Sequence, residues 1–181
     1  EHRNMTNGLL RLTEYRYDPN GNRTRAIETV TGSNRVITTG WAYDSRNRPQ
    51  IMTEALGSAD ERTTRYIYND VGQLYLQKNP NGVEISHFYD ARDRLENLIS
   101  SDNSIRYRYT YDGNNNLLGV QDVVADRDTT RTFDEYNRIK TETQATGLGV
   151  EYAYDRAGRK TREFLPGSNA VDYVYNSAFM A

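Results

Sequence analysis

The stretch that decides the fold is Tyr109-Thr110-Tyr111-Asp112-Gly113-Asn114-Asn115-Asn116-Leu117. Its first half alternates aromatic and polar residues with a period of two, which is typical of a strand with one apolar face. Its second half is made of Asp, Gly and Asn, the residue types that favour tight turns. The stretch therefore predicts a strand that runs into a hairpin loop, after which Leu117 begins the return strand.

The same phrase, an aromatic residue followed by Asp or Asn and a tight turn, occurs eight times at intervals of 21 to 26 residues. The copies begin at Tyr17-Asp18, Tyr43-Asp44, Tyr68-Asn69, Tyr89-Asp90, Tyr111-Asp112, Phe133-Asp134, Tyr154-Asp155 and Tyr175-Asn176. Self-similarity at a short period indicates a repeat architecture. We therefore expect residues 1–181 to form a single repeat region of about eight units.

Two positions of each turn carry the prediction of its conformation. An Asp or Asn beside the aromatic can bond its own backbone two residues on. These residues are Asp18, Asp44, Asn69, Asp90, Asp112, Asp134 and Asp155. Three residues later stand Gly21, Asn47, Gly72, Asp93, Asn115, Asn137 and Gly158. All seven tolerate positive φ, so we expect a type I turn closed by a left-handed residue.

The tyrosines of the Tyr-x-Tyr pairs are expected to share one face of the sheet and to stack from strand to strand as a ladder. The ladder residues are Tyr15, Tyr17, Tyr66, Tyr68, Tyr109, Tyr111, Tyr152, Tyr154, Tyr173 and Tyr175. A second turn signal falls half a period later, which gives two strands per period. The fold class is therefore all-β, an array of consecutive antiparallel hairpins in a sheet that twist curves or spirals. A propeller with blades of about 40 residues is the alternative.

Composition limits the function. The net charge of -2 and the pI near 5.8 argue against a general affinity for nucleic acid. The mean hydropathy is -0.90, and no apolar run approaches the length of a spanning helix, so membrane insertion is not expected. Cysteine is absent, which excludes disulfides and thiolate chemistry. Leu, Ile, Val and Phe are scarce, so any core should be built from the 15 Tyr.

No residue is predicted to be catalytic, to bind a cofactor or to hold a metal. His87 stands where other repeats carry a tyrosine, which indicates a structural role. The turns at Asp18 and Asp112 begin like calcium loops, with oxygen ligands at alternate positions, but they lack the Gly and Glu that complete such a loop. Asn4-Met5-Thr6 and Asn22-Arg23-Thr24 match the glycosylation sequon, a weak pattern. We interpret the strand arginines as part of a solvated face of mixed charge. Those arginines are Arg16, Arg65, Arg106 and Arg108.

Three segments resemble the YD repeat of the Rhs family: Tyr15-Arg16-Tyr17-Asp18-Pro19-Asn20-Gly21-Asn22-Arg23, Tyr109 to Leu117, and Tyr152-Ala153-Tyr154-Asp155-Arg156-Ala157-Gly158-Arg159. The family includes bacterial Rhs polymorphic toxins, the shell subunits of insecticidal toxin complexes, and animal teneurins. The motif recurs in register over nearly the whole chain. His87 and Arg131 replace the first tyrosine in two units, and Phe133 replaces a second one.

The resemblance implies a sheet that spirals into a hollow shell. We expect this chain to be a non-catalytic section of such a shell, a fragment that encloses or presents a toxin or effector domain. Its expected partners are other YD-repeat segments, copies of itself and an enclosed toxin domain. The parent protein is expected to be secreted or at the cell surface, with no signal peptide in this chain. The alternative is an adhesion module whose tyrosines and Asn-rich loops bind a carbohydrate or a cell-surface protein, and an enzyme is third.

Overall fold

The computed structural model describes residues 2–6, 9–30, 32 and 35–175, and the side chains from residue 11 onward. The described residues form strands joined by short turns and contain no helix. The strands are β1 (His2–Thr6), β2 (Leu9–Tyr17), β3 (Arg23–Val30), β4 (Arg35–Tyr43), β5 (Pro49–Glu54), β6 (Arg62–Tyr68), β7 (Leu74–Lys78), β8 (Glu84–Tyr89), β9 (Leu95–Ser100), β10 (Arg106–Tyr111), β11 (Leu117–Asp122), β12 (Arg127–Phe133), β13 (Ile139–Thr143), β14 (Gly149–Tyr154), β15 (Lys160–Leu165) and β16 (Asn169–Asp172).

Strand formation follows the period-two pattern of the sequence. In β10 the three tyrosines are half-buried, whereas the two arginines and Thr110 between them are exposed. Aromatic residues favour strands because their rings pack on the pleated surface. Cross-strand register keeps the pattern on one face, since Tyr107 lies opposite Leu98 of β9 and Asp122 of β11.

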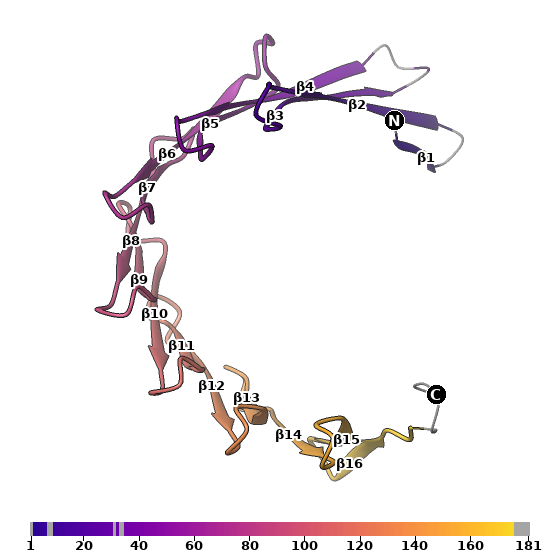
Figure 1. The fold of residues 1–181 in the computed structure, drawn as a ribbon, viewed down its shortest axis with the longest axis vertical. Helices are drawn as coiled ribbons and strands as arrows, with labels where there is room; N and C mark the ends of the chain where they lie inside the picture. Colours follow the sequence, from indigo (N-terminus) through magenta and orange to yellow (C-terminus); the bar gives the residue numbers. More distant parts are fainter. Residues whose placement is uncertain (1, 7–8, 31, 33–34, 176–181) are drawn as a thin grey trace. The chain divides into compact units, whose positions relative to one another are not determined.

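The chain divides into two compact units, Glu1–His87 with Ser100–Asp102, and Phe88–Ile99 with Asn103–Ala181. In the first unit each strand pairs antiparallel with the next, without interruption from β1 to β8. In the second unit the same holds from β9 to β16. The strands of each unit therefore follow one another in chain order (Figure 1). Such unbroken runs contradict the propeller, whose blades are separate four-stranded sheets.

A register shift marks the strand end before six of the Tyr-Asp turns. Thr110 pairs with Gly119, but its neighbour Tyr111 pairs with Leu117. Equivalent shifts occur before the turns at Asp18, Asp44, Asn69, Asp134 and Asp155. A type I turn closed by a left-handed residue produces such a bulge. The predicted turn chemistry thus sets the register of each hairpin.

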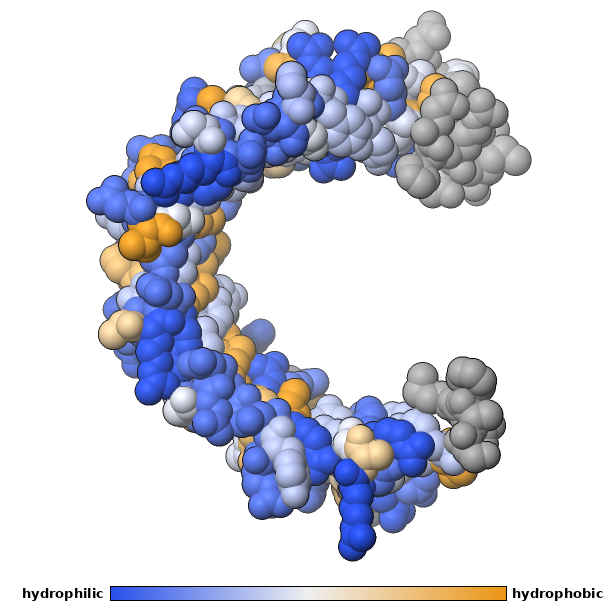
Figure 2. Space-filling model, in the orientation of Figure 1, coloured by the Kyte–Doolittle hydropathy of each residue, from blue (hydrophilic) through white to orange (hydrophobic). Residues whose placement is uncertain are grey.

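The sheet is a single layer, and among the described residues no hydrophobic side chain is fully buried. The buried polar residues are Thr53, Thr64 and Ser100. Figure 2 shows mostly hydrophilic residues on the visible side of each unit, with small separate apolar patches. The expected tyrosine core is therefore a half-buried aromatic face rather than a closed interior.

One of the longer repeats places additional residues at its second turn, which is the loop between β5 and β6. The loop between β5 and β6 folds back on β4, and the Leu56 amide donates a hydrogen bond of 2.8 Å to the Thr38 carbonyl. A Cβ on Gly40 would lie 3.0 Å from Leu56 Cδ2, so glycine makes room for this contact. The insertion thus packs on the sheet and leaves the strand order unchanged.

Candidate functional site: the Tyr-Asp turns

The seven predicted left-handed residues all have positive φ. The values are 85° at Gly21, 59° at Asn47, 96° at Gly72, 62° at Asp93, 71° at Asn115, 60° at Asn137 and 82° at Gly158. In each turn the amide of this residue donates to the carbonyl of the Asp or Asn three residues before it. The distances are between 3.0 and 3.3 Å. The turn residues therefore lie where the sequence pattern places them, and the eighth turn, at Asn176, lies outside the described residues.

The Asp side chain closes its own turn from within. Asp90 Oδ1 accepts the amide N–H groups of Arg92 at 2.8 Å and Arg94 at 3.0 Å. Its Oδ2 accepts Arg94 Nε at 2.7 Å. The same three bonds recur at Asp18, Asp44, Asp112, Asp134 and Asp155, with Arg or Asn as the side-chain donor. Each of these carboxylates therefore accepts three N–H groups, with both of its oxygens engaged.

These donors favour the ionised carboxylate. The Arg94 side chain and the amides of the turn lower the pKa of Asp90 from 3.8 to about 2. The pKa values of the other five turn aspartates are also lowered, because the residue four positions later hydrogen-bonds each carboxylate. A carboxylate whose pKa is lowered in this way is a poor general base, and both of its oxygens already accept N–H groups.

Among the described turns, the one that begins with Asn forms the same side-chain contact with donor and acceptor exchanged. Asn69 Nδ2 donates to Gln73 Oε1 at 2.7 Å, and Asn69 Oδ1 accepts the Gln73 amide at 2.9 Å. Where the turn begins with Asp, the residue four positions later is a donor, Arg or Asn. Where it begins with Asn, the residue four positions later supplies an acceptor. The two positions are therefore chemically matched.

Five of the turn-preceding tyrosines also bind the repeat before them. The Tyr154 hydroxyl donates to the Ile139 carbonyl at 2.8 Å. Equivalent bonds join Tyr43 to Arg23, Tyr68 to Pro49, Tyr111 to Leu95 and Tyr175 to Lys160. The acceptor is always the backbone of the residue that begins the return strand. This explains why Arg, Pro or Lys can replace the apolar residue in that position.

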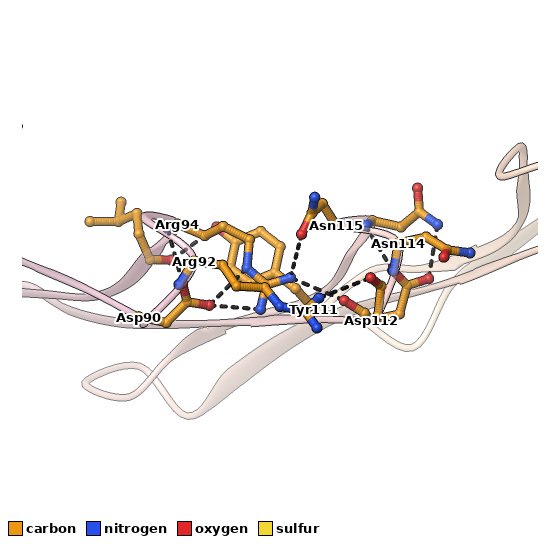
Figure 3. A network of polar contacts seen from close by, with 10 residues as sticks. Asp90, Arg92, Arg94, Tyr111, Asp112, Asn114 and Asn115 are labelled. Carbon is orange, nitrogen blue, oxygen red and sulfur yellow. Dashed lines mark hydrogen bonds and ion pairs between the residues drawn. The ribbon is translucent and has the colours of Figure 1, made fainter.

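Arginine provides a second link between repeats (Figure 3). The Arg94 guanidinium lies over the Tyr111 ring at 4.5 Å from its centre, and Arg94 Nη1 donates to Asp112 O and Asn115 Oδ1 at 3.0 Å each. Arg92 Nη1 donates to the Gly113 carbonyl at 2.9 Å. The stacking recurs for Arg48 on Tyr68, Arg138 on Tyr154 and Arg159 on Tyr175, at 4.3 to 4.7 Å. Arg94 thus joins its own aspartate to the next repeat.

The tyrosine ladder is half-buried over most of its length. Among the predicted members, Tyr15 and Tyr17 are exposed, at 36% and 60%, and the others are partly buried. Burial raises the pKa of Tyr66, Tyr68, Tyr109, Tyr111 and Tyr152. Their rings therefore form a partly dehydrated face in each unit.

The arginines that stack are not the strand arginines that we interpreted as part of a solvated face of mixed charge. The strand residue Arg16 pairs with Glu14 at 3.0 Å on an exposed surface. The stacking residues stand four positions after the turn aspartate instead. The spacing Asp-x-x-x-Arg, present at Asp44, Asp90, Asp134 and Asp155, is the sequence signal that marks them.

Sequence reasoning also missed an ion pair on the aromatic face of the second unit. Lys160 Nζ donates to Glu163 Oε2 at 2.8 Å, and the Tyr173 hydroxyl donates to the same oxygen at 2.9 Å. The Glu163 carboxylate and the Tyr173 hydroxyl raise the pKa of Lys160. Lys160 Nζ also lies 4.5 Å from the centre of the Tyr173 ring. The lysine is thus held in its charged form as a structural contact.

The remaining polar candidates have structural surroundings. His87 is half-buried in β8, burial lowers its pKa, and its Nδ1 has no hydrogen-bond partner among the described residues. The Asn22 side chain of one sequon donates to Asp18 Oδ2 and to Asn47 Oδ1. The side chains of the other sequon, at residues 4–6, lie outside those described. Within the described ranges, no three His, Cys, Asp or Glu side chains gather closely enough to hold a metal ion.

No family model matches the chain. Mouse Teneurin-4 is 28% identical over 143 residues, which are 76% of this chain and 4% of Teneurin-4. The crystal structure of TcdB2-TccC3-Cdc42 superposes with a TM-score of 0.68 at 15% identity, over 93% of this chain and 10% of that one. The Tc holotoxin pore of Photorhabdus luminescens gives 0.67 at 16% identity, over 91% and 10%.

The chain therefore spans a tenth or less of the length of these three proteins. In the part of the chain that the structure describes, no helix is both long and apolar enough to cross a membrane. The sequence repeats and the fold of the chain are thus similar to those of YD-repeat proteins, which supports its resemblance to the Rhs family.

Proposed function

We propose that this chain is a non-catalytic section of a YD-repeat shell that encloses or presents a toxin or effector domain. The shell belongs to a larger protein that is secreted or exposed at the cell surface. The partners of this section are further YD-repeat segments on either side, or copies of itself, and the enclosed domain.

One observation carries the proposal: the recurring polar residues of each repeat are used to hold the next repeat. Tyr111 reaches back to Leu95, while Arg94 reaches forward to the Tyr111 ring and the Asp112 carbonyl. A sheet whose recurring donors and acceptors are satisfied by neighbouring repeats is suited to form the wall of a shell. The turn carboxylates also support a role without catalysis, because N–H donors lower their pKa and a carboxylate of low pKa is a poor general base.

The single-layered sheet supports enclosure. Its aromatic face is half-buried, and no second layer covers it among the described residues. In a shell this face would point inward, where the enclosed domain and neighbouring walls limit its contact with water.

Protease protection in the natural full-length protein tests the proposal. We expect the non-repeat domain to survive a protease concentration that digests the same domain when it is expressed alone. Unfolding the repeats with urea should abolish this protection. Equal digestion of the free and the repeat-linked domain would contradict enclosure.

A binding module is the second candidate, and one groove favours it. Tyr136 is 68% exposed and lines a groove of about 590 Å³ with Arg138, Tyr154 and Arg156. Exposed aromatic rings beside polar groups suit a sugar ring or a surface loop of another protein. Binding to a glycan array that is lost in Tyr136→Ala would favour this function over the shell.

A further inference from the structure

The turns are of two chemical kinds, which differ in the residue four positions after the aspartate. Arg48, Arg94, Arg138 and Arg159 define the guanidinium kind. The turns at Asp18 and Asp112 have Asn at this position and also two residues earlier, as Asp-x-Asn-x-Asn. These two turns are the ones that look like the start of a calcium loop. Their alternating amides require another explanation, because both oxygens of each aspartate already accept N–H groups.

In both amide turns the two side chains converge on a single atom of the next repeat. Asn114 Nδ2 and Asn116 Nδ2 donate to Asn137 Oδ1 at 2.9 and 2.8 Å. In the first unit, Asn20 Nδ2 and Asn22 Nδ2 donate to Asn47 Oδ1 at 3.2 and 2.7 Å. The acceptor is each time an Asn in the left-handed position of the next turn. The same five-residue arrangement thus occurs twice, in separate units.

The guanidinium turns do not depend on that side chain. Arg94 and Arg138 donate to the carbonyls of Asp112 and Asp155, at 3.0 and 3.3 Å, and stack on the next aromatic ring. A backbone carbonyl and an aromatic ring are present in any following repeat. Accordingly, the left-handed residue after an arginine turn is Gly72, Asn115 or Gly158.

We propose that Asp-x-Asn-x-Asn turns are selective connectors that require Asn or Asp in the left-handed position of the following repeat. Guanidinium turns tolerate Gly in that position, because their contacts with the backbone carbonyl and the aromatic ring do not use its side chain. The side-chain oxygen has two lone pairs, and each receives one N–H, so a glycine there removes one hydrogen bond from each amide, although Asn22 and Asn116 keep their bonds to Asp18 and Asp112. The two kinds of turn thereby determine which repeat can follow which. This inference rests on the proposed role of the chain as a scaffold of ordered repeats.

A matched pair of substitutions in the second unit tests it. Asn137→Gly and Asn115→Gly both replace an exposed left-handed Asn, with φ of 60° and 71°. Both leave a residue that favours this conformation, so the backbone effect is the same. We expect backbone amides of residues 112–116 and 134–138 to exchange hydrogen about three- to tenfold faster in Asn137→Gly, because two hydrogen bonds are lost. Asn115→Gly should stay within about twofold of the parent, since Arg94 keeps its other contacts.

Two further variants make the result specific. Asn137→Asp keeps an acceptor oxygen and should exchange like the parent. Adding Asn116→Arg to Asn137→Gly converts the junction to the guanidinium kind and should restore slow exchange. Equal acceleration in Asn137→Gly and Asn115→Gly, or failure of both rescues, would overturn the proposal. Protease protection of an enclosed domain is measured separately. The proposal of a shell can therefore be contradicted while the proposal of selective connectors is confirmed, and the reverse.

Discussion

The hydroxyl of Tyr154 donates a hydrogen bond of 2.8 Å to the backbone carbonyl of Ile139, in the preceding repeat. Because the acceptor is backbone, this bond can recur wherever a tyrosine precedes the turn, whatever residue begins the return strand. Where the tyrosine is present, the YD repeat thus joins its unit to the preceding one through a backbone acceptor that every residue type supplies.

Removing this hydroxyl should weaken the array. We expect Tyr154→Phe to lower the free energy of unfolding by about 0.5–1.5 kcal/mol, the usual net value of one hydrogen bond. Urea denaturation monitored by circular dichroism measures the loss. Tyr136→Phe is the control at an exposed ring and should change stability by less than about 0.5 kcal/mol. An equal effect of both substitutions would show that the bond to Ile139 contributes nothing.

Adding a hydroxyl should raise the stability at Phe133, the one aromatic residue in the described turns that lacks a hydroxyl. Phe133→Tyr introduces a donor at the position from which other repeats reach back, and the corresponding carbonyl is that of Leu117. We expect a rise of about 0.5–1 kcal/mol in the same assay. A loss of stability would mean that the Phe133 ring is packed too closely to accept an oxygen.

The left-handed turn position should reject a β-branched residue. Gly158 has φ of 82°, and a Cβ built on it would meet no atom within 4 Å. Any cost of Gly158→Val is therefore conformational, and we expect at least about 1 kcal/mol. Gly113 is equally open but lacks positive φ, so Gly113→Val is the control and should cost clearly less. Equal losses at both glycines would show that the turn type is not what limits the choice of residue.

An unused donor offers a stabilising substitution. Arg48 Nη1 is buried without a hydrogen-bond partner among the described residues, and the next turn has Gly72 where the turn after Arg94 has Asn115. Gly72→Asn should supply the missing acceptor and be more stable than Gly72→Ala by about 1 kcal/mol. Thermal unfolding of the two variants decides the matter. If alanine is at least as stable, the side chain does not reach Arg48.

Stability should fall in acid over a defined range. The pKa of Asp90 is about 2 in the fold against 3.8 ordinarily, so the folded state prefers the ionised form. The stabilisation is complete above the ordinary pKa and is lost as pH falls through about 2. Urea midpoints should therefore drop between pH 4 and pH 2, more gently in Asp90→Asn. Asp60→Asn, in an exposed loop, controls for the loss of one charge. A parent protein whose midpoint is constant over this range would contradict the account.

Local geometry could be predicted from the sequence because it depends on residues close together in the chain. The Asp at 112 and the left-handed Asn at 115 lie within one turn, and their residue types report its conformation directly. The alternation of Tyr107, Tyr109 and Tyr111 likewise sets the strand and its half-buried face. The fold class follows from repeating this unit.

Contacts between repeats could not be predicted in the same way. The spacing of Asp90 and Arg94 is visible in the sequence, but the Tyr111 ring that receives the guanidinium is 17 residues further on. Its position depends on the register of two intervening strands. Some return strands begin with Arg23, Pro49 or Lys160, whereas others begin with Leu or Ile. The element that recurs at these positions is a backbone carbonyl, which accepts the tyrosine hydroxyl, so the side-chain pattern of the sequence does not reveal it.

Cryo-electron microscopy of the natural full-length protein tests the central claim most directly. We predict that this chain forms part of a continuous wall in which further YD hairpins pair with its outer strands. The face that carries Tyr109 and Tyr152 should line an internal volume that holds a non-repeat domain. A separate, self-contained domain whose tyrosine face is open to solvent, with no repeats paired to its edges, would contradict the account.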